Sequence, residues 1–252
     1  MRPRLAGLLC ALGLGPAAVA GTPPDIWTSP KIPAEDPGAL FAKLDQAAAG
    51  LPAQLKPAVQ FQKTLLQIRA GNNESAWRAD LERAARNTAE DGVSVALREF
   101  AKYWLARLSV QQIDKALRKY YAEAVRFPDT LAEVKKNIPE ATAADPWGQP
   151  WVYRPRPPAG LAKLTKQRYQ LGPTRWPELS TFAEAVKSAP SARTWKIMLR
   201  DMGGNKVLEI RFSDGKSAAL QPGGHAADVT LAYIGDGWAL FTDTERLFTA
   251  TF

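Results

Sequence analysis

The sequence predicts an α+β protein, with a helical N-terminal region whose long helix packs on a small antiparallel sheet, and a small C-terminal all-β domain. Two patterns of apolar residues predict this class. They recur at α-helical spacing through residues 36–125, and they alternate with polar residues in short runs through residues 195–251. Because 46% of the 252 residues are hydrophobic and 23% are charged, the composition is that of a globular protein.

The chain begins with the features of a secretory signal peptide. Two arginines near the start precede an apolar run at 5–14, which is too short to span a bilayer. Small residues at Ala18 and Ala20 fit the positions that signal peptidase recognises. We therefore expect residues 1–20 to be cleaved off after Ala20, and the mature protein to reach the periplasm or the extracellular space.

Helix-terminal residues divide the region that follows. Proline is frequent at 21–35, which we interpret as an extended lead-in to a first domain at 36–189. Asp36 is a candidate N-cap before a proline, and glycines follow three of the apolar periodic segments. The four expected helices span residues 37–49, 53–70, 76–90 and 94–125.

Shorter elements follow the long helix. Thr130 and Glu133 have the spacing of a capping box, which predicts a short helix. A turn rich in proline and tryptophan then precedes residues of strand composition. The other expected elements are strands at 151–153 and 168–171, paired as an antiparallel hairpin, and a helix at 178–187.

The apolar period changes from helical to two after a linker of small residues at 188–191. We therefore expect a separate β-domain at 190–252, and we expect residues 21–189 to fold without it. Asp214-Gly215 and similar turn sequences separate its strands. The six expected strands span 195–199, 208–212, 217–221, 229–234, 238–242 and 247–251, and they would form a small barrel or folded sheet.

Part of the chain resembles a known family. The residues that carry the resemblance are Ile113, Asp114, Ala116, Leu117, Tyr120, Tyr121, Phe127, Pro128, Leu131, Asp145, Pro146, Trp147, Gly148, Pro150, Trp151, Tyr153, Tyr169, Leu171 and Gly172. Over about residues 96–172, the chain resembles the soluble part of the major pseudopilin of bacterial type II secretion systems. The resemblance implies a long helix packed on a small antiparallel sheet, which the Asp-Pro-Trp-Gly turn enters.

The chain departs from that family in two places. Pseudopilins begin with a prepilin-peptidase site and an apolar helix, whereas this chain begins with an ordinary signal peptide and a proline-rich segment. The acidic calcium-binding loop of the family would follow the last matching strand, but residues 172–176 contain no carboxylate. We therefore expect the pseudopilin fold without its calcium ion and without incorporation into a filament.

The turn also has a structural explanation that is independent of the family. Proline fixes φ, glycine adopts conformations that other residues resist, tryptophan buries a large area, and aspartate accepts hydrogen bonds from nearby backbone N–H groups. We expect this motif to stabilise the fold without taking part in catalysis; binding through exposed aromatic rings is the alternative. The motif consists of Asp145, Pro146, Trp147, Gly148, Pro150, Trp151 and Tyr153.

Positive charge is concentrated in residues 145–200. Ten of the 33 basic residues lie there, but only three of the 25 acidic ones. A solvated surface explains this segment, and the alternative is attraction of an anionic lipid surface, an envelope polymer or incoming DNA. Cytosolic nucleic acid is not an expected partner of an exported chain. The candidate anion-facing residues are Arg154, Arg156, Lys163, Lys166 and Arg168.

Few residues suited to catalysis are present. Cys10 is the one cysteine and His225 the one histidine, which excludes Cys/His zinc sites, Cys–His dyads and multi-histidine metal centres. We expect His225 to lie on the surface, in a turn between strands, and we expect no catalytic residue and no cofactor. The carboxylate pairs that a hydrolase could use are Glu90 with Asp91 and Asp243 with Glu245.

These observations indicate a non-catalytic protein of the bacterial envelope. We expect a structural or docking component related to type II secretion or pilus-type machinery, with an envelope or secretion-system protein as its partner. The alternatives are a binding module for an anionic polymer or DNA, and a hydrolase with a carboxylate pair.

Overall fold

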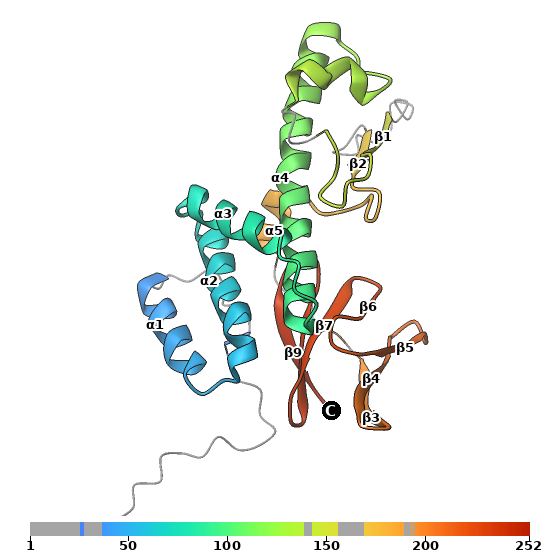
Figure 1. The fold of residues 1–252 in the computed structure, drawn as a ribbon. Helices are drawn as coiled ribbons and strands as arrows, with labels where there is room; N and C mark the ends of the chain where they lie inside the picture. The colour runs from blue at the N-terminus through green and yellow to red at the C-terminus, as the bar shows by residue number, and fades with distance from the viewer. Residues whose placement is uncertain (1–25, 28–36, 139–142, 156–168, 189–192, 194) are drawn as a thin grey trace, which may run out of the picture.

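A computed structural model describes residues 26–27, 37–138, 143–155, 169–188, 193 and 195–252. The longest helix of the described residues is α4 (Gly92–Ala124), and the other elements are arranged along it (Figure 1). The other helices and the C-terminal strands gather around the N-terminal half of α4, whereas its C-terminal half extends beyond them (Figure 1). The α+β class predicted from the sequence is confirmed, since helices pack with antiparallel sheets.

Three helices precede α4: α1 (Pro37–Ala48), α2 (Lys56–Ala70) and α3 (Glu74–Ala85). The predicted helix at 53–70 begins as a 3₁₀ turn, η1 (Ala53–Leu55), because the proline after Lys56 cannot donate a hydrogen bond within a helix. The predicted helix at 76–90 ends at Ala85, five residues early. Arg98 explains this early end, since its guanidinium donates to the carbonyls of Asn87 and Ala89 in the connecting segment.

Helix α4 begins where two local requirements coincide. Asp91 caps it by accepting a hydrogen bond from the backbone N–H of Ser94 at 3.0 Å. At Gly92 a Cβ atom would lie 2.7 Å from the carbonyl oxygen of Ala232, so only glycine allows the helix to approach the C-terminal sheet this closely. The helix ends at Val125, which adopts the left-handed conformation with φ 57° and is 77% exposed.

The second half of α4 packs on the small hairpin predicted from the sequence. Strand β1 (Val152–Pro155) pairs antiparallel with β2 (Tyr169–Gly172), and Tyr153 lies opposite Leu171. A 3₁₀ segment, η2 (Leu131–Asn137), begins with the expected capping box. The buried residues of this part are Ile113, Ala116, Leu117, Val134 and Tyr169.

The C-terminal strands form two sheets, where the sequence predicts a single barrel or folded sheet. One has the order β3-β4-β5, and the other has the order β6-β7-β8-β9. The bounds are β3 (Lys196–Met202), β4 (Asn205–Arg211), β5 (Ser217–Leu220), β6 (His225–Ala226), β7 (Val229–Ile234), β8 (Trp238–Thr242) and β9 (Leu247–Thr251). His225 is exposed as expected, but it begins strand β6 and does not lie in a turn.

The four-stranded sheet lies between the helices and the three-stranded sheet. On one face, Leu231 and Phe241 pack with Leu208 and other residues of the three-stranded sheet. On the other face, Trp238 and Leu240 join the core that α2, α3 and α4 form. This core crosses the predicted domain boundary near residue 189, so the helices and one face of the four-stranded sheet share an apolar interior.

Residues 26–27 of the predicted lead-in also contribute to that core. Trp27 is only 1% exposed and packs in the helical cluster, with Ile26 partly buried beside it. The predicted signal peptide and the rest of the lead-in lie outside the described residues. No helix within the described ranges combines the length and apolarity that crossing a bilayer requires.

Candidate functional site

The predicted motif at residues 145–153 is organised by one buried carboxylate. Asp145 is 4% exposed, and its Oδ1 accepts hydrogen bonds from the backbone N–H groups of Trp147 and Gln149 at 3.0 and 2.8 Å. Its Oδ2 accepts a third from the N–H of Thr174 at 3.2 Å. Gly148 adopts φ 78°, which closes the turn. Asp145 therefore joins its own turn to the segment that follows β2.

Trp147 holds this turn against α4. Its indole N–H donates to Glu99 at 2.9 Å, and its ring meets the ring of Tyr103 at 5.1 Å between centroids. Arg175 lies over the same ring and pairs with Glu99 at 2.7 Å. The indole is partly buried, in a cluster with Trp151 and other apolar residues.

The other residues of the motif make backbone contacts or face solvent. The Tyr153 hydroxyl donates to the carbonyl of Pro128 at 2.8 Å, and burial raises the pKa of that hydroxyl to about 12. The carbonyl of Pro150 accepts a hydrogen bond from the Thr174 hydroxyl at 2.6 Å, while the ring of Pro146 is partly exposed. These contacts support the structural interpretation of the motif.

The predicted anion-facing set lies largely outside the described residues. Arg154 is described, and it is exposed on β1. The members whose positions lie outside the described ranges are Arg156, Lys163, Lys166 and Arg168. Other charges of the basic segment are balanced locally: Arg175 pairs with Glu99, Arg193 with Asp228 and Asp243, and Arg200 with Glu209.

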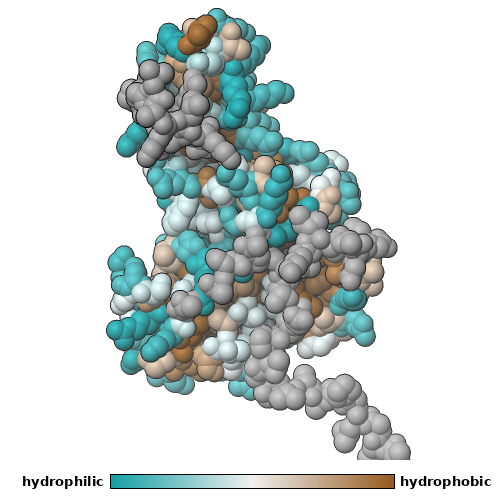
Figure 2. Space-filling model, turned by 180° about the vertical axis from the view of Figure 1, so that it is seen from behind, coloured by the Kyte–Doolittle hydropathy of each residue, from teal (hydrophilic) through white to brown (hydrophobic). Residues whose placement is uncertain are grey.

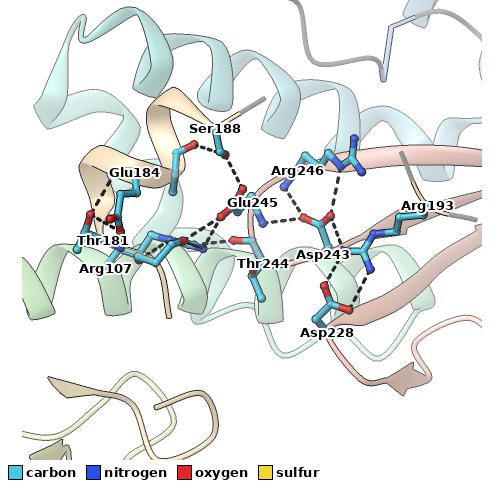
Figure 3. A network of polar contacts seen from close by, with 12 residues as sticks. Arg107, Thr181, Glu184, Ser188, Arg193, Asp228, Asp243, Thr244, Glu245 and Arg246 are labelled. Carbon is cyan, nitrogen blue, oxygen red and sulfur yellow. Dashed lines mark hydrogen bonds and ion pairs between the residues drawn. The ribbon is translucent and has the colours of Figure 1, made fainter. Parts of the chain in front are cut away.

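A buried arginine that the sequence analysis did not identify joins the helices to the C-terminal sheet (Figure 3). Arg107 on α4 is fully buried, and it donates to the carbonyls of Ser180 and Thr244 at 3.2 and 2.5 Å. It also donates to the Ser180 hydroxyl at 3.1 Å and lies 3.8 Å from Glu245. Burial lowers the pKa of this guanidinium to about 10, while Glu245 opposes the shift.

The network continues through the turn between β8 and β9. Asp243 accepts hydrogen bonds from the backbone N–H groups of Glu245 and Arg246, and it pairs with Arg193 at 3.0 Å. Arg193 also bonds both carboxylate oxygens of Asp228. Helix α5 (Phe182–Lys187) joins the same network through its flanking residues, because Glu245 accepts hydrogen bonds from the hydroxyls of Ser180 and Ser188.

The candidate hydrolytic carboxylates therefore take part in structural contacts. Asp243 and Glu245 bind backbone N–H groups, hydroxyls and guanidinium groups across the network. Asp91 caps α4, and Glu90 pairs with Arg98 at 3.3 Å. Within the described residues, no group of three or more histidine, cysteine or acidic side chains is arranged to hold a metal ion.

The hairpin of β3 and β4 exposes large apolar side chains. Met198 is 53% exposed, Met202 is 63% exposed and Leu199 is 39% exposed. β3 is the edge strand of its sheet. Figure 2 shows brown and pale surface mixed with teal at the end of the molecule where the C-terminal strands lie. We call the outer face of this hairpin the methionine face; it contains Lys196, Met198, Arg200, Met202, Asn205, Val207, Glu209 and Arg211.

The register places Val207 between the two methionines of the methionine face. Val207 pairs with Arg200, so it is the diagonal neighbour of both Met198 and Met202. It is only 5% exposed, so the open apolar surface of this face comes from the methionines themselves. The alternation of Ile197 and Leu199 in the sequence predicts an inward face, which leaves both methionines pointing outward. It does not predict that β3 is an edge strand, because strand order depends on contacts distant in the sequence.

Comparison with known proteins assigns no family, since no family model, no curated protein and no solved structure matches the chain. The resemblance to the major pseudopilin is therefore a prediction from residues 96–172. In the structure, α4 packs on the antiparallel pair of β1 and β2.

Proposed function

We propose that the chain is a non-catalytic, exported protein of the bacterial envelope that docks a partner protein through the methionine face. The partner belongs to secretion or pilus-type machinery. Support for export comes from the basic and apolar start and the small residues before position 21. Support for the machinery comes from the resemblance over residues 96–172.

The observation that carries this proposal is the exposure of two methionines on one face of an edge strand. Single exposed apolar residues are ordinary on protein surfaces, but neighbouring ones on a common face are typical of interaction sites. Met198 and Met202 lie on one face of β3, on either side of Arg200, and each is more than half exposed. Methionine is suited to docking because its flexible thioether adapts to the shape of a partner.

The described polar groups favour docking over a hydrolase. The carboxylates at residues 91, 243 and 245 already accept hydrogen bonds that hold helix ends and turns together. The alternative of anion binding depends mainly on basic residues outside the described ranges. The methionine face is thus the surface on which the geometry supports a specific function.

Site-specific photo-crosslinking in the cells that produce the protein tests this proposal. A photoreactive amino acid at position 198 should give a discrete adduct with one envelope protein. The matched control replaces Lys115, which is exposed on α4 and distant in the chain from the hairpin; it should give no such adduct. Equal adducts at both positions, or none at position 198, would overturn the proposal.

A further inference from the structure

We infer that the partner binds as an added strand along the free edge of β3, and that the bound segment is extended, with acidic and apolar residues in alternation. This inference rests on the proposed docking function and specifies its chemistry. Strand addition uses the backbone of an exposed sheet edge for affinity and the side chains beside it for selectivity.

The register of the hairpin identifies the backbone groups that are available. Gly203 and Gly204 form a two-residue turn, which closes on the facing pair of Met202 and Asn205. Facing pairs alternate in an antiparallel ladder between those that exchange hydrogen bonds and those that do not. Counting back from the turn, the residues of β3 that direct N–H and C=O groups to the free edge are Ile197, Leu199 and Asp201.

The length and regularity of this edge favour strand addition. Natural edge strands are commonly short, bulged, interrupted by proline or lined with charged side chains. Of these features β3 has only the charges, on Lys196, Arg200 and Asp201. β3 has seven residues without proline, and its pairing with β4 shows no register shift. An extended segment could therefore pair along its whole length.

The charges beside the edge define the segment. The methionine face carries three cationic side chains, those of Lys196, Arg200 and Arg211, and one carboxylate, that of Glu209. Arg200 pairs with Glu209, which leaves two cations in excess on this face. A strand with glutamate or aspartate on this face would balance them, while apolar residues at other positions would contact the methionines.

The same charges disfavour a second copy of this chain as the occupant. Antiparallel pairing of two β3 strands about Leu199 would place Arg200 of one copy opposite Met198 of the other, and Lys196 opposite Met202. The two lysines and two arginines of the paired strands would then lie on one face with only the two Glu209 carboxylates beside them, so the excess positive charge of this face would double. A partner with acidic residues avoids this repulsion.

Leu199→Pro tests the backbone contact separately from the fold. The N–H of Leu199 faces the free edge, so a proline there removes a donor for the added strand and leaves the ladder with β4 intact. Leu199→Ala is the matched control, because it shortens the side chain and keeps the N–H group. Both proteins should show the thermal unfolding profile of the parent to within a few degrees.

The probe is a fluorescent peptide as long as β3, in which valine alternates with glutamate, titrated into full-length protein. We expect saturable binding that weakens as salt rises, with an affinity about tenfold lower for Leu199→Pro than for Leu199→Ala. A peptide with lysine in place of glutamate should bind about tenfold more weakly. Equal binding to the two Leu199 variants, or no binding of the glutamate peptide, overturns strand addition.

Two further outcomes separate this inference from the function on which it rests. If Leu199→Pro retains the adduct formed in cells from position 198, strand addition is wrong while the docking function stands. If position 198 forms no adduct, the docking function itself fails. A dimer in sedimentation equilibrium that Leu199→Pro dissociates would identify a second copy as the occupant and overturn the acidic partner.

Discussion

The guanidinium of Arg107 on α4 donates a hydrogen bond to the main-chain carbonyl of Thr244 at 2.5 Å, which ties together residues 137 positions apart in the chain. Thr244 lies in the turn between β8 and β9, so this bond links the central helix to the C-terminal sheet. It is one of several bonds from a side chain with no exposed surface. The helices and the C-terminal strands are therefore joined by polar contacts as well as by a common apolar core.

Replacing Arg107 should be strongly destabilising. Arg107→Ala removes the guanidinium partner of the carbonyls of Ser180 and Thr244 and the cation beside the carboxylate of Glu245. We expect a cost of about 3–5 kcal/mol in the free energy of unfolding. Urea denaturation measures this change. The control is Arg83→Ala, which removes an exposed arginine from an ion pair on α3 and should cost less than about 1 kcal/mol. Equal effects of the two substitutions would show that the buried network contributes little.

Asp145→Asn should destabilise the protein although it preserves the size of the side chain. Three backbone N–H groups point at the two carboxylate oxygens, so the amide NH₂ of asparagine would face one of these donors. We expect a cost of about 1–3 kcal/mol, measured by thermal or urea unfolding. Gln149→Ala, which changes an exposed side chain in the same turn, should stay within about 0.5 kcal/mol of the parent. A parent-like Asp145→Asn protein would contradict the central role of this carboxylate.

The N-cap of α4 predicts a pH dependence. Hydrogen bonds from Ser94 hold the pKa of Asp91 below its ordinary value. The ionised carboxylate therefore stabilises the folded protein more than the protonated carboxyl group does. Its contribution is complete above the ordinary carboxyl pKa and is lost as the pH falls through the lowered one. Asp91→Ala should therefore cost about 0.5–2 kcal/mol at neutral pH, and less in acid. A difference in urea midpoint that is the same at both pH values would exclude this origin.

The shared core predicts that the helical region depends on the C-terminal strands. A chain that ends at residue 189 would lose Trp238, Leu240 and Leu247 from the core and the Thr244 partner of Arg107. We expect this fragment to unfold without a cooperative transition, followed by circular dichroism during heating, whereas the full chain should unfold cooperatively. A cooperative transition in the fragment would favour the division at residue 189 that the sequence predicts.

The sequence predicts local elements well because their causes are local. The long helix was expected at 94–125 and spans Gly92–Ala124, since an N-cap and continuous helical spacing define it. The hairpin at Asp214-Gly215 follows from its turn residues, and Gly215 adopts the expected positive φ. The division of the C-terminal strands into two sheets has no such local signal, because it depends on packing between residues distant in the sequence. The four-stranded sheet packs against the helices on one face and against the three-stranded sheet on the other.

The same distinction applies to the candidate sites. The Asp145 turn could be predicted because its donors at residues 147 and 149 are close in the chain. Arg107 could not be paired from the sequence, since its partners lie 73 and 137 residues away. One signal was available: Arg107 falls on the apolar face of its helix with Phe100 and Trp104. The sequence predicts that the tryptophans of this turn bury a large area, but not that Trp147 packs partly buried against Tyr103 on α4, 44 residues earlier in the chain.

The most direct test of the account measures crosslinking at the hairpin tip with and without the two methionines. A photoreactive amino acid at position 205, which lies on the methionine face opposite Met202, reports on the occupied hairpin. Met198→Gln with Met202→Gln replaces both exposed apolar side chains by polar ones of similar length. If the partner docks through the methionine face, the adduct should fall about tenfold in the double variant, while the thermal unfolding of that variant matches that of the parent. An unchanged yield from a folded double variant would contradict docking through the methionine face.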